Sequence, residues 1–275
     1  MKESIPAGIS FAEDIGSFNF TANIDMLVHI LCLDGSFSFT RSHTRFNVSA
    51  TDYVILTPGI GLSGIAYSET VKVIIMSFPE SVVHTSVIRS NYGVFGHLSL
   101  IENPVLKLNA RDFSRCRRDM ENLRKRNAET AHIFHGELTG ALLKAHILDL
   151  YDIHARTNRR TEISSRPAQI MQSFIGKLTT GGYTGCRKLD RYASELCITP
   201  HYLTEISKKT SGRPATYWIE LFLIRATTIA LMQLDRPLEE IADALSFSSL
   251  SHFSRFVKSR LEQTPTQFRN QLRGK

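Results

Sequence analysis

The sequence predicts an α+β protein with more than one domain, in which a β-rich N-terminal part precedes an all-helical C-terminal part. Apolar residues recur with a period of two in the first hundred residues and with helical spacing after residue 109. A chain of 275 residues is long for one domain and comfortable for two. We expect a β-barrel domain over 1–108, a helical region over 109–157, a linker over 158–167 and a helical domain over 168–275.

Three runs in the β-rich part have the pattern of strands. In 26–39, the pair Asp34-Gly35 stands between apolar residues, which is a strong signal for a β-hairpin. The run 45–61 continues the alternation until a Pro-Gly break, and the apolar run 71–78 predicts a buried strand. Together they predict a small barrel or sandwich of the jelly-roll kind.

Helical spacing of apolar residues begins directly after Asn109, a residue that suits a helix N-cap. A second apolar helix is expected roughly over 129–155. The basic runs RCRR and RKR could bind phosphate, but acidic residues interleave with them, so we favour a solvated face. A helical pair in this position is typical of a dimer contact or a linker. The apolar residues at heptad-like spacing are Phe113, Cys116, Met120 and Leu123.

Positive charge is concentrated in the C-terminal part. From residue 165 onward, 16 Lys and Arg stand against 9 Asp and Glu, which accounts for the whole formal net charge of +7. A basic bias on this scale is typical of a nucleic-acid binder, although an anionic membrane or an acidic protein would also fit.

The basic part contains an internal repeat. Residues 192–209 can be laid over 241–259 with an offset of 49 before a turn and 50 after it, so the second turn holds one inserted residue. Each copy predicts a short helix, a tight turn and an amphipathic helix, which is the helix-turn-helix arrangement. The caps expected for the amphipathic helices are Thr199, with Pro200 behind it, and Ser248 or Ser249.

A stretch without Gly or Pro, 215–234, connects the two copies. It predicts a helix of about 30 Å at 1.5 Å per residue. This length is close to one turn of B-DNA, about 34 Å, so the helix could place both amphipathic helices in successive major grooves. The side chains expected to fasten it to the two bundles are Trp218, Leu221, Phe222, Ile224 and Leu231.

The region 168–275 resembles the DNA-binding domain of the AraC/XylS family of bacterial transcription regulators. Ser246 and Glu262 depart from the family pattern, because each stands where glycine is common. If either site needs a positive φ, the residue there costs about 1 kcal/mol. The residues that match the pattern IA, LGF, SxFxRxFK and TPxx[YF]R are Ile241, Ala242, Leu245, Phe247, Ser251, Phe253, Arg255, Phe256, Lys258, Thr264, Pro265, Phe268 and Arg269.

The resemblance implies that the protein activates transcription by contacting RNA polymerase at double-stranded promoter DNA, often under control of a small ligand. It also implies a cupin-like N-terminal domain that binds the effector and dimerises. From the residues alone, that domain could equally enclose a small molecule or serve only for dimerisation.

The polar faces of the two amphipathic helices are the candidate DNA-reading surface, with Tyr202, Leu203 and Ile206 expected on the buried side of the first. Glu205 suits a cytosine amino group and Arg255 a guanine, although Arg255 could instead form a buried or phosphate-facing ion pair. The residues expected to contact bases are His201, Thr204, Glu205, Leu250, Ser251, Ser254 and Arg255. Those expected to contact phosphates are Lys208, Lys209 and Lys258.

Catalytic and metal sites are not indicated. The histidines of the β-rich part stand singly, without carboxylates at ligand spacing: His29, His43, His84 and His97. The cysteines lack CxxC spacing and are expected to be reduced and structural: Cys32, Cys116, Cys186 and Cys197. There is no Gly-rich phosphate loop or nucleophile elbow. We therefore expect no enzyme activity, no cofactor and no metal.

Two functions of different class remain. We expect a cytoplasmic, homodimeric, ligand-controlled transcription regulator, since no apolar run could span a bilayer and the N-terminus lacks the pattern of a secretion signal. The alternative is a constitutive architectural DNA binder whose N-terminal domain only dimerises. Ligand-dependent DNA affinity separates the two.

Overall fold

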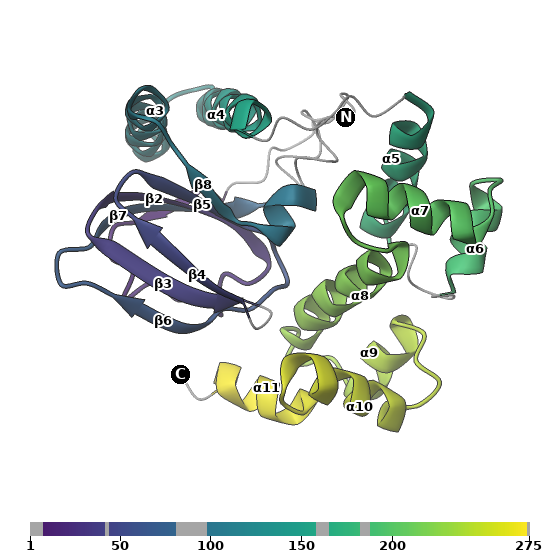
Figure 1. Cartoon of the computed structure of the whole chain (residues 1–275). Coiled ribbons are helices and arrows are strands. Elements are labelled where there is room, and N and C mark those ends of the chain that lie inside the picture. The colour runs from purple at the N-terminus through teal and green to yellow at the C-terminus, as the bar shows by residue number, and fades with distance from the viewer. Residues whose placement is uncertain (1–7, 42–43, 81–97, 158–164, 182–187, 274–275) are drawn as a thin grey trace. The chain divides into compact units, whose positions relative to one another are not determined.

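The computed structural model describes residues 8–41, 44–80, 98–157, 165–181 and 188–273 of the chain (Figure 1). The chain divides into two compact units, Met1–Arg159 and Arg160–Lys275. Across the described residues, no helix combines the length and apolar character needed to cross a membrane.

The N-terminal unit contains two antiparallel sheets. One has the strand order β1 (Ser10–Ala12), β7 (Lys72–Pro79), β2 (Met26–Asp34), β5 (Asp52–Leu56) and β8 (Val105–Lys107). The other has the order β4 (Thr44–Ser49), β3 (Ser36–Arg41) and β6 (Ser63–Tyr67). The expected barrel is therefore wrong for the described strands, which form two separate sheets and no closed cylinder.

The expected hairpin at Asp34-Gly35 is also wrong. β2 pairs with β5 and β7, whereas β3 pairs with β4 and β6, so the chain passes from one sheet to the other at Gly35. Gly35 has a φ of 66°, and a Cβ atom there would lie 2.8 Å from the backbone of Val71. A glycine is needed at this corner for the same backbone reason that favours glycine in a tight hairpin turn.

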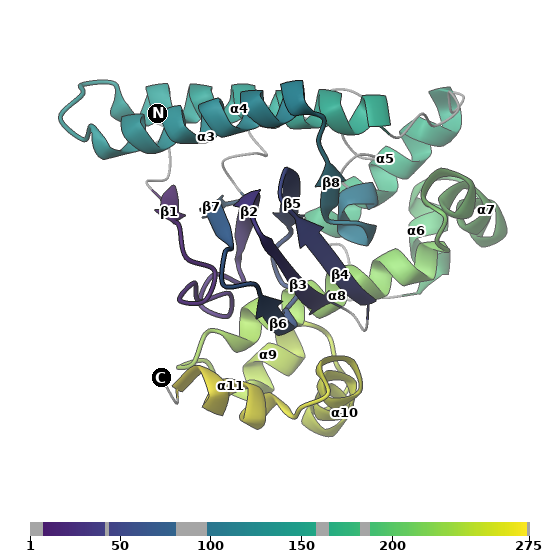
Figure 2. The same ribbon diagram turned by 60° about the vertical axis from the view of Figure 1, so that its left-hand side comes forward.

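The five-stranded sheet is covered on both faces, which explains the continuous apolar runs of its central strands. Val28 and Ile30 pack with Phe37 and Phe39 of the smaller sheet. The opposite face packs against α3 (Ala110–Ala128) and α4 (His135–Thr157), which lie side by side along the sheet (Figure 2). The unit thus has three layers: a small sheet, a large sheet and a helix pair.

The predicted cap of α3 is confirmed, because the Asn109 side chain accepts a hydrogen bond from the backbone N–H of Asp112. Cys116, Met120 and Leu123 are fully buried against the sheet. The apolar seam of α3 therefore packs within the N-terminal unit. α4 begins later than expected, at His135.

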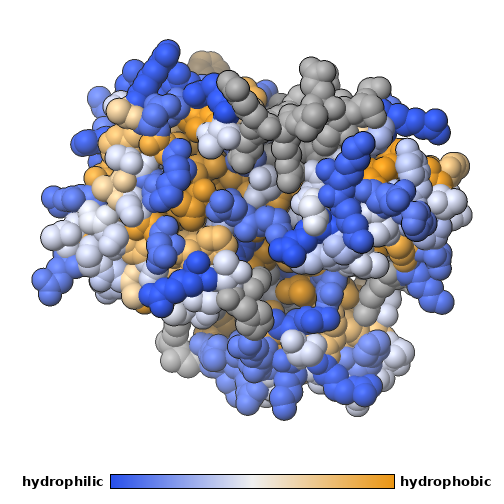
Figure 3. All heavy atoms as spheres, viewed as in Figure 1, coloured by the Kyte–Doolittle hydropathy of each residue, from blue (hydrophilic) through white to orange (hydrophobic). Residues whose placement is uncertain are grey.

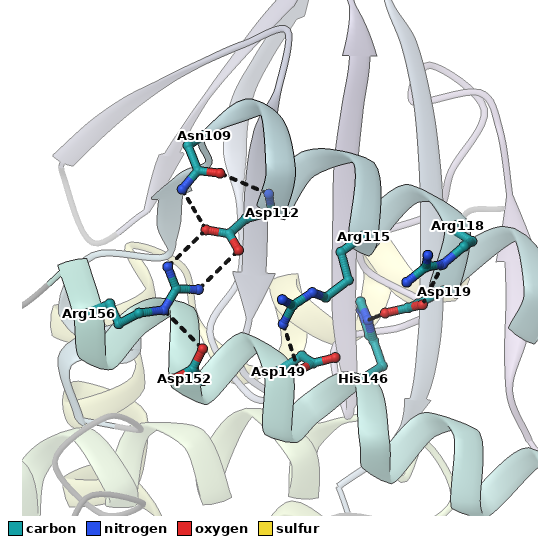
Figure 4. Close-up of polar contacts among 9 residues, drawn as sticks. All are labelled: Asn109, Asp112, Arg115, Arg118, Asp119, His146, Asp149, Asp152 and Arg156. Atoms are coloured by element: carbon teal, nitrogen blue, oxygen red, sulfur yellow. Dashed lines mark hydrogen bonds and ion pairs between the residues drawn. The ribbon is translucent and has the colours of Figure 1, made fainter.

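Ion pairs tie α3 to α4 (Figure 4). Arg156 donates to both carboxylate oxygens of the buried Asp112, at 3.0 and 3.2 Å, and thereby lowers the pKa of that carboxyl. Arg115 donates to Asp149 at 2.9 Å. Within the basic runs of α3, Arg115 pairs with Asp149, Arg117 with Glu121 and Arg126 with Glu129. These three pairs support the interpretation of the runs as a solvated, charge-paired face rather than a phosphate site.

The C-terminal unit is all-helical. Its helices are α5 (Ser165–Thr179), α6 (Leu189–Glu195), α7 (Pro200–Ser211), α8 (Ala215–Leu231), α9 (Leu238–Ala244), α10 (Leu250–Leu261) and α11 (Pro265–Arg273). α5 begins inside the range 158–167 that was expected to be a linker, while 158–164 lies outside the described residues.

The connecting helix α8 packs against α5 and α7 on one side of the repeat and against α9, α10 and α11 on the other. Trp218 is fully buried and donates its indole N–H to Ser211 at 2.8 Å, while Leu231 is buried in the second core. The prediction that apolar residues of this helix fasten both bundles is confirmed for these two side chains.

α8 is shorter than the predicted 215–234, since it ends at Leu231. At 1.5 Å per residue its 17 residues span about 25 Å. The buried Arg269 explains this end: its guanidinium donates to the carbonyl oxygens of Leu231, Gln233 and Arg236, at 3.2, 2.7 and 2.6 Å. These bonds hold the chain in a turn where the sequence alone predicts further helix.

Candidate nucleic-acid interface

The first helix-turn-helix motif turns through a left-handed residue. Cys197 follows α6 with a φ of 54°. Its N–H donates to the Ser194 carbonyl at 3.0 Å, and the N–H of Ile198 donates to Ala193 at 3.0 Å. This pair of bonds is the Schellman motif, which requires a left-handed residue after the helix.

The second motif repeats this backbone 49 residues later. Ser246 has a φ of 56°. Its N–H donates to Asp243 and that of Phe247 donates to Ala242, both at 2.8 Å. The sequence repeat is therefore a repeat of backbone geometry, and Ser246, which stands where glycine is common, does adopt a positive φ.

The ends of the amphipathic helices are also equivalent. Gly212 follows α7 with a φ of 79°, and Glu262 follows α10 with a φ of 60°, which confirms the second strained position. At the helix starts, Thr199 accepts from the N–H of Tyr202 at 3.2 Å and Ser249 accepts from the N–H of His252 at 3.1 Å. Of the two caps predicted for the second helix, Ser249 is thus the one used.

The exposed face of α7 carries the predicted polar residues. His201 and Glu205 are exposed, with the His201 Nδ1 atom 3.7 Å from a Glu205 carboxylate oxygen. Thr204 is half-buried and donates its hydroxyl to the Pro200 carbonyl at 3.0 Å, which leaves its oxygen lone pairs as acceptors. Lys208 is exposed at the other end of the helix, and so is Lys209.

One expectation for α7 is wrong. Leu203 and Ile206 are buried as predicted, but the ring of Tyr202 is 39% exposed. At 100° per residue Tyr202 lies at the border of the apolar face, and the core behind α7 is filled without it. The pattern in the sequence could not decide on which side this ring would lie.

The exposed face of α10 carries Ser251, Arg255 and Lys258, with Ser254 half-buried. The Arg255 side chain is exposed, so its alternative role in a buried ion pair is wrong. Leu250, which is expected to contact bases, is half-buried and packs against the second core with part of its side chain. Polar side chains cover much of the surface over α10 and α11 (Figure 3).

His252 was not predicted and occupies the same position on α10 as Tyr202 on α7, 50 residues earlier. It is exposed, its Nδ1 atom lies 3.1 Å from the Ser248 hydroxyl, and its ring packs edge-on against Phe247 at 5.3 Å between centroids. These contacts hold the ring on the exposed face of α10, with Nδ1 directed at Ser248. The offset of 50 in the repeat pairs Tyr202 with His252 and could have identified both.

The N-terminal unit holds a buried chain of polar rings. The Tyr53 hydroxyl lies 3.0 Å from His29 Nδ1 and 2.8 Å from His146 Nε2, so it donates to one ring and accepts from the other. Burial lowers the pKa of His29 and raises that of Tyr53. These hydrogen bonds link the large sheet to α4. Burial of the ring keeps His29 in its neutral form.

No metal site was found among the described residues, in which no three His, Cys, Asp or Glu side chains are close enough to share an ion. Four of the histidines and cysteines named above lie outside the described residues: His43, His84, His97 and Cys186. A pocket of about 20 Å³ lies beside β2 and β5, lined mainly by apolar side chains that include Phe20, Ile24, Met26 and Leu62.

Comparison with known proteins assigns the C-terminal unit. Residues 192–271 match a family model described as a helix-turn-helix domain. The HTH-type transcriptional regulator ArgR of Pseudomonas aeruginosa is 36% identical over 86 residues, which cover 31% of this chain and 26% of that protein. The match thus spans about a quarter of the relative's length.

Two solved structures of ToxT from Vibrio cholerae are similar over most of both chains. The complex with an unsaturated fatty acid, from strain SCE256, has a TM-score of 0.52 and 15% identity, covering 89% of this chain and 87% of that one. The complex of the O395 protein with (E)-4-(8-methylnaphthalen-1-yl)but-3-enoic acid has a TM-score of 0.53 and 12% identity, covering 95% and 97%. At these identities the similarity shows the fold.

Two capped helix-turn-helix motifs, joined by one helix and matched by the domain model, define the DNA-binding domain of a transcription regulator. The matched helix-turn-helix domain is of the AraC/XylS type, which is found in DNA-binding transcription regulators.

Proposed function

We propose that the protein is a transcription activator that reads two successive major grooves of promoter DNA with α7 and α10. The repeat of left-handed turn and cap carries this proposal, because it holds two polar helix faces on equivalent scaffolds. A protein that read one major groove with one helix-turn-helix motif would need only one such polar face. The basic excess of this unit supplies the attraction to DNA phosphates.

The roles of individual side chains follow from their chemistry. Arg255 suits guanine O6 and N7, Glu205 suits a cytosine amino group, and Lys258 at the far end of α10 suits a phosphate. Tyr202 and His252 join the proposed contacts, since each is exposed beside the cap. The remaining proposed base contacts are His201, Thr204, Leu250, Ser251 and Ser254, and the remaining phosphate contacts are Lys208 and Lys209.

The N-terminal part, 1–108, is proposed to sense a small ligand, with 109–157 serving dimerisation. Support for a ligand comes from the fold shared with ToxT, which was solved with an unsaturated fatty acid. An effector bound in the pocket beside β2 and β5 would have to widen it, because its volume of about 20 Å³ holds about one water molecule. We also propose that the protein acts in the cytoplasm and activates transcription by contacting RNA polymerase.

One alternative is a constitutive architectural DNA binder whose N-terminal unit only dimerises. The two functions differ in a measurable way. DNA affinity that changes on addition of an apolar carboxylic acid supports the regulator, and affinity that stays constant across a panel of such ligands supports the architectural protein.

A matched pair of variants on α10 tests base reading. Arg255→Ala should weaken binding to the preferred site by roughly five- to a hundredfold, equivalent to about 1–3 kcal/mol, and should weaken binding to random DNA much less. Lys258→Ala should weaken binding to the preferred site and to random DNA equally. It should also reduce the slope of log affinity against log salt concentration by about 1, which corresponds to the loss of one phosphate contact. Equal losses on both DNAs for Arg255→Ala would show that Arg255 contacts phosphate instead.

A further inference from the structure

The chain of polar rings in the N-terminal unit ends at a nitrogen atom that makes no hydrogen bond. His146 of α4 is buried, with 1% of its surface accessible. Its Nε2 atom lies 2.8 Å from the Tyr53 hydroxyl, whereas its Nδ1 atom has no hydrogen-bond partner among the described residues. A carboxylate oxygen of Asp119 on α3 lies 3.9 Å from Nδ1, too far for a hydrogen bond (Figure 4). Buried polar atoms without a partner are rare in folded proteins, so this nitrogen is a candidate for a group that changes state.

We propose that His146 is a proton-binding site, and that one proton taken up there reverses the hydrogen bonds that run through Tyr53 to His29. The N-terminal unit then contains a switch that responds to pH. The proposal concerns this unit alone and does not depend on how the protein reads DNA.

The Asp119 carboxylate sets the direction of the hydrogen bonds before the proton binds. The contact with His146 and the neighbouring Arg118 lower the pKa of Asp119, so this carboxyl is ionised at neutral pH. A neutral His146 ring therefore turns its N–H, rather than its lone pair, toward Asp119. Nε2 then accepts the Tyr53 O–H, and the Tyr53 oxygen accepts the Nδ1–H of His29 at 3.0 Å. Both rings carry their proton on Nδ1 in this state.

Protonation of His146 reverses each of these bonds. An imidazolium donates from both nitrogens, so Nε2 must now donate to the Tyr53 oxygen. The Tyr53 hydrogen then turns to His29 Nδ1, which can accept it only if the His29 proton stands on Nε2. The net change is one proton gained, with the added charge on His146 and with His29 still neutral.

The two rings differ in their ability to hold that charge. The His29 ring packs edge-on against Phe78 at 4.9 Å between centroids, and burial lowers its pKa. His146 instead faces Asp119, whose side chain is 26% exposed and so reaches solvent. A proton that enters the chain of rings is therefore held at His146, where an opposite charge stabilises it.

The other ionisable groups beside the rings do not compete for the proton. Arg118 lies 3.6 Å from Asp119 and is always charged. Burial raises the pKa of the Cys116 thiol to about 12, so this group stays neutral. The ionisable groups that the described elements place around His146 are Tyr53 from β5, His29 from β2, and Cys116, Arg118 and Asp119 from α3, while β7 contributes the apolar Phe78.

The test is nuclear magnetic resonance of the full chain with isotope-labelled histidine, because the ring nitrogen shifts report both the protonation state and the tautomer of each ring. The signals are assigned with His29→Gln and His146→Gln, and circular dichroism shows that the protein stays folded. Between about pH 8 and about pH 5, the wild type should show protonation of His146. Over the same range, neutral His29 should change from the Nδ1–H to the Nε2–H form.

Two variants separate a coupled switch from two independent histidines. Tyr53→Phe keeps the aromatic ring and removes the hydroxyl, so His146 should still bind a proton while His29 no longer changes its tautomer. Asp119→Asn removes the facing charge and should lower the ratio of protonated to neutral His146 at a given pH by about tenfold or more. Glu121→Gln is the matched control on α3, because Glu121 pairs with Arg117, and it should leave this ratio unchanged.

Several results would overturn the proposal. These are a His146 ring that stays neutral in the folded protein over the whole range, and a wild-type His29 ring that keeps one tautomer throughout. Equal effects of Asp119→Asn and Glu121→Gln would do the same, as would a tautomer change that persists in Tyr53→Phe. Because Asp119 is only half-buried, its variant should fold even if Tyr53→Phe does not, and the comparison with Glu121→Gln then decides.

Discussion

The left-handed residue in the second turn allows a stability prediction with a definite sign. Ser246 has a φ of 56° and closes a Schellman motif with bonds of 2.8 Å. A left-handed conformation costs an L-residue about 1–2 kcal/mol, and glycine avoids this cost. Against this, glycine adds about 0.4–1 kcal/mol of conformational freedom to the unfolded chain. Ser246→Gly should therefore stabilise the C-terminal unit by about 0.5–1 kcal/mol.

The measurement is urea unfolding followed by tryptophan fluorescence. Trp218 is the single tryptophan of the chain and is fully buried in this unit, so its emission reports the relevant transition. Ser259→Gly is the matched control, because Ser259 is exposed in the last turns of α10, where glycine should destabilise by about 0.5 kcal/mol. A midpoint that does not rise for Ser246→Gly would refute the assignment of strain to this turn.

Three further changes have expected outcomes. Ser249→Ala removes the cap of α10 and should cost about 1 kcal/mol in urea unfolding while weakening DNA binding; unchanged stability would show that the cap is replaceable. Arg269→Ala leaves buried carbonyls without their donor and should cost about 2–4 kcal/mol in the same assay, whereas an exposed Arg273→Ala should cost little. His29 is held neutral in the fold, so the unfolded chain binds an extra proton below pH 6.5, and the stability of the N-terminal unit should fall as pH decreases through that value, by up to about 1.4 kcal/mol per pH unit. His29→Gln should reduce this slope, as measured by urea unfolding followed by circular dichroism at pH 7.5 and 5.5, and an unchanged slope would contradict the role of His29.

Features that depend on local chemistry were predictable from the sequence. The caps at Asn109 and Thr199 and the repeat of the two motifs rest on neighbouring residues, and the structure confirms them. The sequence also marked Ser246 and Glu262 as positions where glycine is common, and both adopt a positive φ in the structure.

Features that depend on distant residues were not predictable. Asp34-Gly35 looks locally like a hairpin, and only the pairing of β2 and β3 with other strands makes it a corner between sheets. The end of α8 is set by Arg269, which lies 38 residues beyond Leu231. The exposure of Tyr202 depends on what fills the core behind α7, and no periodicity contains that information.

The proposed function requires α7 and α10 each to read a major groove. Selection of bound duplexes from a random DNA library, with the full chain at two salt concentrations, measures whether they do. We expect two short motifs about one helical turn, or 10–10.5 base pairs, apart, with the second motif altered by Arg255→Ala. Binding without any enriched motif, which collapses as salt rises, would contradict the claim and leave only phosphate contacts.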